Sequence, residues 1–230
     1  MTVAENLGRV RERIAAACAR AGRDPASVRI VAVSKTQPAE AVREAVAAGA
    51  DAIGENRVQE AAGKRPLVTG ATPWHLIGPL QRNKARAALE LFDVIETVDR
   101  PELADRLEGL LAPLGRVLPV FLEVNVAGEQ QKSGVLPGVA PALAERIVAG
   151  CPHLSIRGVM TVPPYHPDPE RARPVFAQLR RLAREIAARA GLAPLELSMG
   201  MTEDFEVAVE EGATLVRLGR VVFGERRAAP

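Results

Sequence analysis

The 230-residue chain has few aromatic side chains: five Phe, one Tyr and one Trp, or 3% of its residues. Proteins that hold single-stranded nucleic acid stack its bases on aromatic rings, so this scarcity argues against that class. Charge of one sign is not in excess either, since 30 Lys and Arg face 28 Asp and Glu and the net charge is +2. Such a balance gives no general attraction to nucleic acid or to an anionic membrane.

Cysteine and long apolar runs are also scarce. Cys18 and Cys151 lie in separate helical patterns without metal-type spacing, so we expect free thiols, no metal and a reducing compartment. No apolar run is long enough to cross a bilayer, and residues 1–22 lack the apolar core of a signal peptide. These absences predict a cytoplasmic protein with no membrane partner.

Short apolar runs and helical patterns alternate along the chain. We predict strands at residues 28–34, 51–54, 74–77, 93–97, 117–124, 156–160, 195–198 and 214–218. We predict helices at residues 5–21, 39–48, 57–64, 83–91, 101–111, 140–149, 170–190 and 203–211. Each strand but the last is followed by a substantial helix, and a Pro-rich segment from residue 162 onward is expected to form an exposed loop after the sixth strand.

This alternation is typical of a (β/α)8 barrel, which takes about 250 residues. A doubly wound open sheet has the same periodicity, but no Gly-rich nucleotide fingerprint follows the first strand. We therefore predict an α/β fold, a single (β/α)8 TIM barrel over residues 1–230 with an extra N-terminal helix.

The first predicted strand runs into a lysine, in the segment VAVSKTQP. Lysine favours the surface, so a lysine at a strand end most often marks the point where the chain meets water. In a barrel, however, the functional groups lie at the carboxyl ends of the strands. Alternation puts Val31, Val33 and Lys35 on one face, and an inward face would bring Lys35 to the barrel mouth. Desolvation there would disfavour its ammonium form and make the amine a nucleophile.

Two glycine turns follow the seventh and eighth predicted strands. One strand ends at Ser198 and enters Met199-Gly200-Met201, with Thr202 as the expected N-cap of the next helix. The other strand ends just before Gly219 and Arg220. Glycine is common punctuation between a strand and a helix, but the loops after strands seven and eight of a (β/α)8 barrel frequently bind phosphate. The free N–H groups of two such turns predict an anion site.

An amine opposite an anion site suggests a ligand with an aldehyde and a phosphate, and lysine amines form Schiff bases with pyridoxal phosphate (PLP). Arg217 shares a face with Leu215 and is expected to meet the pyridine nitrogen, although an outward ion pair is the plainer interpretation. A guanidinium does not give up its proton, so the nitrogen would stay unprotonated and the ring would be a weak electron sink. A Schiff-base aldolase that binds a sugar phosphate without PLP fits the same pattern.

Seven segments in order resemble the YggS/PROSC family of pyridoxal phosphate homeostasis proteins, whose barrel is similar to the N-terminal barrel of alanine racemase (PLP fold-type III). These segments are VAVSKTQP, GENRVQE, WHLIGPLQRNK, EVNVAGEQQKSGV, GVMTV, LSMGMTEDFEVAVEEGATLVRLG and VFGER, and the match runs from about Val28 to Arg226. The resemblance implies that PLP forms a Schiff base with Lys35. It implies further cofactor contacts from Asn56, Ser198, Met199, Arg217, Gly219 and Arg220.

Two positions depart from the family pattern. Many relatives carry a small hydroxyl residue where Arg220 stands, so the resemblance assigns only the backbone N–H of Arg220 to the phosphate. Many relatives carry tyrosine where Arg57 stands, and no side-chain role follows for it. We expect His75 to be a packed, hydrogen-bonded residue rather than a catalytic one. The segment Glu129–Ser133 fits either a lid over the mouth or a solvated loop.

Catalysis on the cofactor is a separate question. By the resemblance, alanine racemase uses a tyrosine from a second domain on one face of the imine, whereas the one tyrosine here, Tyr165, lies in the Pro-rich loop. With Arg217 weakening the electron sink, this favours a PLP carrier without a catalytic residue, which buffers the cofactor and supplies PLP-dependent apo-enzymes. A small PLP-dependent amino-acid racemase is the alternative. We expect a monomer or a weak homodimer.

Overall fold

Eight parallel strands close into a barrel in the computed structural model, which describes residues 1–224. Strand β1 (Arg29–Val33) pairs with both β2 (Ala52–Glu55) and β8 (Leu215–Leu218), and this double pairing closes the sheet. The strands between them are β3 (Trp74–Leu76), β4 (Val94–Val98), β5 (Leu118–Glu123), β6 (Leu154–Met160) and β7 (Glu196–Ser198). The predicted fold class is confirmed. The span of one domain over residues 1–230 stays a prediction, because it extends past the described residues.

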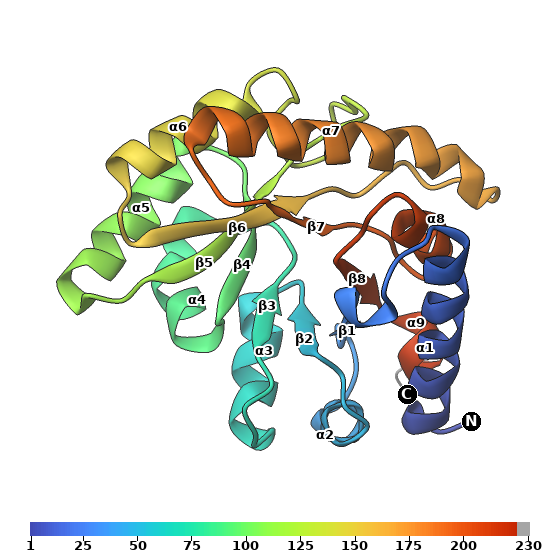
Figure 1. The fold of residues 1–230 in the computed structure, drawn as a ribbon. Coiled ribbons are helices and arrows are strands. Elements are labelled where there is room, and N and C mark those ends of the chain that lie inside the picture. Colours follow the sequence, from blue (N-terminus) through green and yellow to red (C-terminus); the bar gives the residue numbers. More distant parts are fainter. Residues whose placement is uncertain (225–230) are drawn as a thin grey trace.

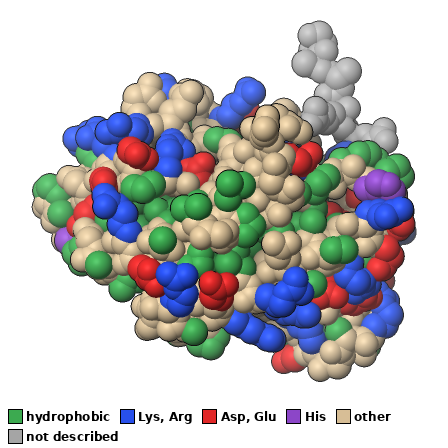
Figure 2. Space-filling view, turned by 90° about the horizontal axis from the view of Figure 1, so that it is seen from above, with side chains coloured by type: hydrophobic (Ala, Val, Ile, Leu, Met, Phe, Trp, Pro, Cys, Tyr) green, Lys and Arg blue, Asp and Glu red, His purple; other side chains and the backbone are tan. Residues whose placement is uncertain are grey.

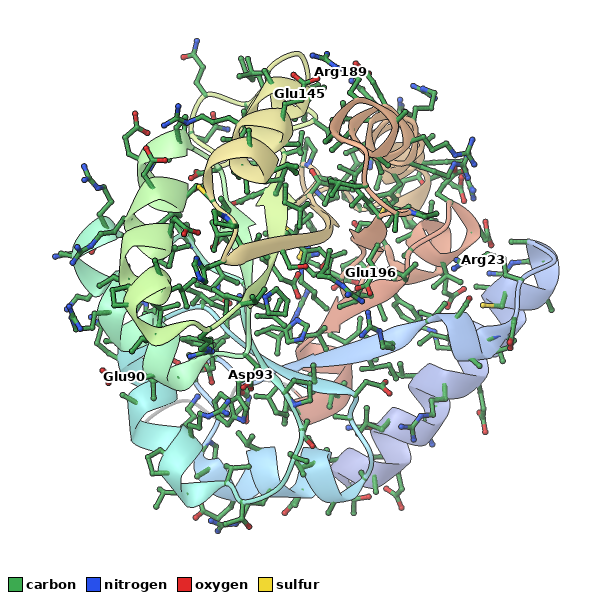
Figure 3. All side chains as sticks on the ribbon, turned by 60° about the vertical axis from the view of Figure 1, so that its left-hand side comes forward. Arg23, Glu90, Asp93, Glu145, Arg189 and Glu196 are labelled. Atoms are coloured by element: carbon green, nitrogen blue, oxygen red, sulfur yellow. The ribbon has the colours of Figure 1, made fainter. Side chains whose placement is uncertain are left out.

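Helices surround the barrel, as Figures 1 and 3 show. They are α1 (Val3–Arg20), α2 (Ala39–Ala47), α3 (Val58–Lys64), α4 (Ala85–Leu91), α5 (Pro101–Leu111), α6 (Ala140–Gly150), α7 (Arg173–Ala190), α8 (Phe205–Glu210) and α9 (Arg220–Phe223). Short 3-10 turns lie at Pro25–Ser27, Arg65–Leu67, Arg82–Lys84, Ala112–Leu114 and Pro169–Ala172. Within residues 1–224, no helix combines the length and the apolar character needed to cross a membrane.

Alternation along the strands divides their side chains between the helix layer and the barrel interior. On β1, Ile30 and Ala32 pack in the large core beneath the helices, whereas Val31 belongs to a separate cluster inside the barrel. That inner cluster contains Val31, Ala52, Phe121, Met160 and Leu215, with Val94 packed against it. Further polar and charged side chains are buried in the barrel region, among them Glu96, Ser198 and Arg217. The interior therefore combines an apolar cluster with buried charges.

The extra N-terminal helix α1 lies against α8 and α9, near the end of the described chain (Figure 1). It starts with a capping box, in which the Thr2 hydroxyl accepts the Glu5 N–H and the Glu5 carboxylate accepts the Thr2 N–H. The Asn6 side chain donates to the Val222 carbonyl of α9 at 2.9 Å. The Arg13 guanidinium lies 4.5 Å from the centre of the Phe205 ring of α8. Helix α1 thus packs against α8 and α9, the two helices that follow β7 and β8.

Two predicted helix starts were wrong. Helix α8 begins at Phe205 with Asp204 as its N-cap, not Thr202, because residues 201–204 form their own turn, in which the Asp204 N–H donates to the Met201 carbonyl. The predicted helix 170–190 is divided into a 3-10 turn over Pro169–Ala172 and α7, which has a proline in its first turn. Proline is tolerated there because its missing N–H would have no partner inside the helix.

Candidate functional site

Lys35 and the Gly219 turn lie at the carboxyl ends of neighbouring strands. Val31 pairs with Arg217 in the β1–β8 register, and Ala32 pairs with Leu218. One residue further along each strand, a Cβ built on Gly219 would lie 3.5 Å from the Val33 carbonyl oxygen. Because Lys35 follows Val33 by two residues, it lies at the same rim as the Gly219 turn.

Lys35 is exposed and belongs to a turn that follows β1, not to the strand itself. In this turn the Gln37 N–H donates to the Ser34 carbonyl at 2.9 Å, and Thr36 has a φ of +65°. The expected desolvation of the Lys35 amine is therefore wrong for the protein alone. Strand β1 ends at Val33, and the turn carries Lys35 out of the packed wall into water.

The two glycines of the expected anion site have different reasons to be glycine. Gly200 has a φ of +92°, and a Cβ on it would lie 2.6 Å from the Ala208 Cβ, so the fold itself requires glycine there. Gly219 has a negative φ of −104°, and a Cβ on it would have no neighbour closer than 3.5 Å. Neither conformation nor packing requires glycine at 219, and its missing side chain leaves space at the rim.

Unused N–H groups adjoin that space. Helix α9 makes its first hydrogen bonds from Val222 and Phe223 to the Gly219 carbonyl, at 2.9 Å each. The N–H groups of Gly219 and Arg220 have no acceptor among residues 1–224. By contrast, the Met199 N–H donates to the Leu215 carbonyl at 3.1 Å, so it is already engaged. The phosphate contact expected from Met199 stays a prediction.

Below the rim, a buried network joins four strands; it consists of His75, Glu96, Ser198 and Arg217, and we name it the inner network. The His75 Nδ1 and the Ser198 hydroxyl each bond one carboxylate oxygen of Glu96. The Arg217 Nη1 donates to the Ser198 Oγ at 2.7 Å, and its Nη2 donates to the Thr161 carbonyl at 2.7 Å. His75 is therefore the packed, hydrogen-bonded residue that its place on an apolar strand predicts.

Burial and neighbouring charges shift the pKa values of two groups in the inner network, Glu96 and Arg217. Burial by itself raises the pKa of Glu96, but the hydrogen bond and charge of His75, the charge of Arg217 and the Ser198 hydrogen bond together hold the pKa below its usual value. Burial lowers the pKa of Arg217, and the nearby carboxylates of Glu96, Asp204 and Glu123 oppose that shift. The Ser198 hydroxyl and two Arg217 nitrogens are engaged within the protein, so their cofactor contacts stay predictions.

A cavity of about 210 Å³ lies at the ends of β2, β3, β5 and β6, and its lining includes Asn56 but neither Lys35 nor a residue of the inner network. Its lining includes Asn56, Glu123, Asn125, Lys132 and Ser133. The Asn56 Oδ1 and the Glu123 Oε2 are buried without a hydrogen-bond partner in the described part of the chain. Burial, together with the charge of Asp99, raises the pKa of Glu123 to about 7. Unpartnered acceptors in a cavity are suited to a ligand that donates hydrogen bonds.

Two residues of the segment Glu129–Ser133 contribute to this cavity, and the lid stays a prediction. Lys132 and Ser133 line the cavity, and Lys132 forms an ion pair with Glu129. The Asn125 side chain donates to the Glu129 carbonyl at 2.8 Å and so ties the loop to the end of β5. Its end, Lys132 and Ser133, therefore forms part of the cavity wall.

Sequence reasoning missed Glu96 and Glu123 as site residues. Each is an acid inside an otherwise apolar strand pattern, DVIET for Glu96 and VFLEV for Glu123. Buried carboxylates are rare unless they are paired or functional, so an acid in such a strand was the available signal.

The exposed Tyr165, at 78% accessibility, lies on the loop after β6. On the face seen in Figure 2, basic, acidic and apolar side chains are interspersed, with no broad area of one charge.

The barrel and its mouth define the class of protein, an alanine racemase-type N-terminal barrel. The family model described as "Alanine racemase, N-terminal domain" matches residues 6–227. A protein of Pseudomonas aeruginosa named pyridoxal phosphate homeostasis protein is 47% identical over 228 residues, which cover 98% of this chain and 96% of the relative. A protein of the same name from Aquifex aeolicus is 42% identical and covers 99% of this chain and 100% of the relative.

A solved structure gives the same result. PipY from Synechococcus elongatus, determined with PLP bound, has a TM-score of 0.85 at 39% identity, over 97% of this chain and 100% of PipY. This chain belongs to the family of pyridoxal phosphate homeostasis proteins, and the family predicted from its motifs is confirmed. The last of those motifs, VFGER, ends in Glu225 and Arg226, which lie outside the described residues.

Proposed function

We propose that the chain binds PLP as a Schiff base on Lys35 and acts in cytoplasmic PLP homeostasis, by buffering the cofactor and supplying it to PLP-dependent apo-enzymes. One observation carries the proposal: an exposed lysine and a turn with unused N–H groups lie at the ends of adjacent strands, β1 and β8. PLP supplies an aldehyde that condenses with an amine and a phosphate that anchors it. Both ends of PLP therefore have a suitable partner at one rim.

Different groups of the protein would contact different parts of PLP. The N–H groups of Gly219 and Arg220 would bind the phosphate, since unused N–H groups at a helix start favour an anion. Ser198 and the Met199 N–H would join them if they exchange their present partners. Arg217 would lie against the pyridine nitrogen. The unpartnered Asn56 Oδ1 would accept a hydrogen bond from the bound ligand.

A carrier fits these residues better than a catalyst. Arg217 is a fully protonated donor, so a nitrogen facing it has no proton source, and the ring is a poor sink for electrons. The phenol of Tyr165 is 78% exposed on the β6–α7 loop. For the amino-acid racemase alternative, this exposed position does not support Tyr165 as the second acid–base group. We propose a monomer or weak homodimer as the working form.

Absorbance spectroscopy of the purified protein with PLP tests the proposal. We expect an imine band in the unmodified protein and no band in Lys35→Ala, while Lys84→Ala, which removes a lysine from the 3-10 turn Arg82–Lys84, keeps it. Borohydride reduction followed by peptide mapping should place the label on Lys35, with little on Lys64, Lys84 or Lys132. A coloured Lys35→Ala variant, or a label mainly on another lysine, would overturn the assignment.

Two activity assays separate the other functions. Racemisation of free alanine at an enzyme-like rate would favour the racemase over the carrier. An uncoloured protein that cleaves a sugar phosphate would favour the aldolase. Neither activity is expected from the carrier.

A further inference from the structure

The turn that carries Lys35 is strained. Ser34 and Gln37 close it by a hydrogen bond, so Lys35 and Thr36 are its two central residues. Thr36, at the second of these positions, has a φ of +65°, while Lys35 has a negative φ. This is the pattern of a type II turn, which normally has glycine or asparagine at that position. A β-branched residue in the left-handed region is a true outlier, and it persists only where the surroundings hold it.

Helix α3 supplies the groups that hold this turn. The Thr36 N–H donates to the Glu60 Oε2 at 2.9 Å. The Lys64 Nζ donates to the Ser34 carbonyl at 2.7 Å. Because Glu60 and Lys64 are four residues apart on α3, they lie on one helix face and reach the turn together. The two bonds are made to the residues immediately before and after Lys35.

The Lys64 side chain is itself held by a second contact, with Glu55. Its Nζ lies 2.7 Å from the Oε1 of Glu55, a residue with no exposed surface, and the Lys64 side chain is only 12% exposed. The same Glu55 oxygen accepts the Ser34 hydroxyl at 2.6 Å. Ser34 directly follows β1 and Glu55 is the last residue of the adjacent β2, so this group lies in the wall between the barrel and α3. We name Ser34, Glu55, Glu60 and Lys64 the outer network.

We propose that Glu60 and Lys64 are positioning residues for Lys35, and that they hold the strained turn so that the amine meets the PLP aldehyde in a reactive orientation. The inference rests on the proposed Schiff base at Lys35. Orientation of a nucleophile contributes strongly to the rate of a condensation, and a displacement of about 1 Å can cost up to about a hundredfold. Release of the turn should therefore slow imine formation without weakening the grip on the phosphate.

The main test compares Glu60→Ala with Glu60→Gln. The alanine variant loses the acceptor for the Thr36 N–H, whereas glutamine keeps a carbonyl oxygen in its place. We expect Glu60→Ala to form the imine about tenfold more slowly than the unmodified protein, and Glu60→Gln to recover most of that loss. The matched control is Glu40→Ala, which removes an exposed acid of α2 whose one described ion pair is with Arg43.

Two further measurements separate positioning from general damage to the fold. Pyridoxine 5′-phosphate has no aldehyde, so its Kd should be the same in Glu60→Ala and in the unmodified protein. Amide hydrogen exchange at Thr36, followed without any ligand, should be about tenfold faster in Glu60→Ala and close to the original rate in Glu60→Gln. A second route uses Lys64→Met combined with Glu55→Met, which removes both buried charges together and avoids leaving one unpaired. It should also slow imine formation.

The outcomes are distinct from those of the proposed function. If Lys35→Ala keeps the imine band, the Schiff-base assignment fails. If Lys35→Ala loses the band but Glu60→Ala reacts at the original rate, only the positioning inference fails. It also fails if Glu60→Ala raises the Kd for pyridoxine 5′-phosphate by the same factor as it lowers the rate of imine formation. That pattern would indicate a general structural defect.

Discussion

The inner and outer networks each combine a cation, buried for Arg217 and 12% exposed for Lys64, with a carboxylate that has no exposed surface, yet they serve different parts of the molecule. In the inner network, both oxygens of Glu96 have partners, and the bonds join strands far apart in the sequence. In the outer network, the Oε2 of Glu55 has no partner among residues 1–224, and the bonds end on one turn. The inner network therefore holds the barrel together, whereas the outer network shapes a single loop.

Removal of the inner cation should give the largest loss of stability. Arg217→Met removes two buried hydrogen bonds, to Ser198 and to the Thr161 carbonyl, and it also removes a positive charge that helps to hold the pKa of Glu96 low. Loss of such a buried charged group costs about 3–5 kcal/mol. Urea denaturation at neutral pH measures this free energy of unfolding. The control is Arg189→Met, which breaks the exposed ion pair with Glu145 seen in Figure 3 and should cost under about 1 kcal/mol. Equal losses in the two variants would remove the distinction between buried and exposed pairs.

Glu123 extends the comparison, because it is a buried carboxylate whose Oε2 has no hydrogen-bond partner within residues 1–224. Its pKa is raised from 4.5 to about 7, so the folded protein binds its proton more tightly than the unfolded chain does. The stability that Glu123 contributes is complete below about pH 4.5, falls as the pH rises to about 7, and does not return above it. Relative to Glu123→Gln, the unmodified protein should lose about 2–3 kcal/mol between pH 5 and pH 8.

Urea titrations of both proteins across that range measure the difference. Glu40→Gln, at an exposed position of α2, should give a curve parallel to that of the unmodified protein. Parallel curves for Glu123→Gln as well would mean that Glu123 titrates in its ordinary range in the folded protein.

Periodicity and composition were sufficient for the barrel. Eight apolar runs with helical patterns between them predicted every strand, and most boundaries lie within a few residues of those observed. The reason is that a strand buried on both faces must be apolar over its length, and this requirement is visible in the local sequence. The rim position of Lys35 followed from the same reasoning, since the carboxyl end of a strand can be located without knowledge of its neighbours.

The networks could not be predicted in the same way. Ser198 and Glu96 are 102 positions apart, and only the closure of the sheet brings their side chains together. Lys64 looked like any polar residue at the end of a surface helix, because its contact with Glu55 depends on how α3 packs on the wall. Gly200 and Gly219 look alike in the sequence as turn residues, and only their φ angles and neighbours distinguish them.

That difference between the two glycines gives a third prediction. Both glycines follow strands of the inner network, β7 and β8. Gly200→Ala forces a side chain into a positive φ and against Ala208, so it should cost about 1–3 kcal/mol of stability. Gly219→Ala should change stability by less than about 0.5 kcal/mol, because nothing in the fold requires glycine there. Yet the methyl group added by Gly219→Ala would occupy space beside the unused N–H groups, and we expect it to raise the Kd for PLP by about tenfold, or about 1.4 kcal/mol. Denaturation and PLP titration of both variants check the pair; a strongly destabilised Gly219→Ala would contradict it.

The smallest effect is expected at Arg220, whose ion pair with Glu203 is far more exposed than the Lys64–Glu55 pair of the outer network. The two side chains are 62% and 46% exposed, so water and salt screen their attraction and the pair adds under about 1 kcal/mol. Arg220→Ser keeps the backbone N–H that we assign to the phosphate, and it should change the Kd for PLP by less than about threefold. Titration at low and high salt measures this. A tenfold loss at low salt that disappears at high salt would show instead that the Arg220 side chain itself binds the phosphate, through a charge that salt can screen.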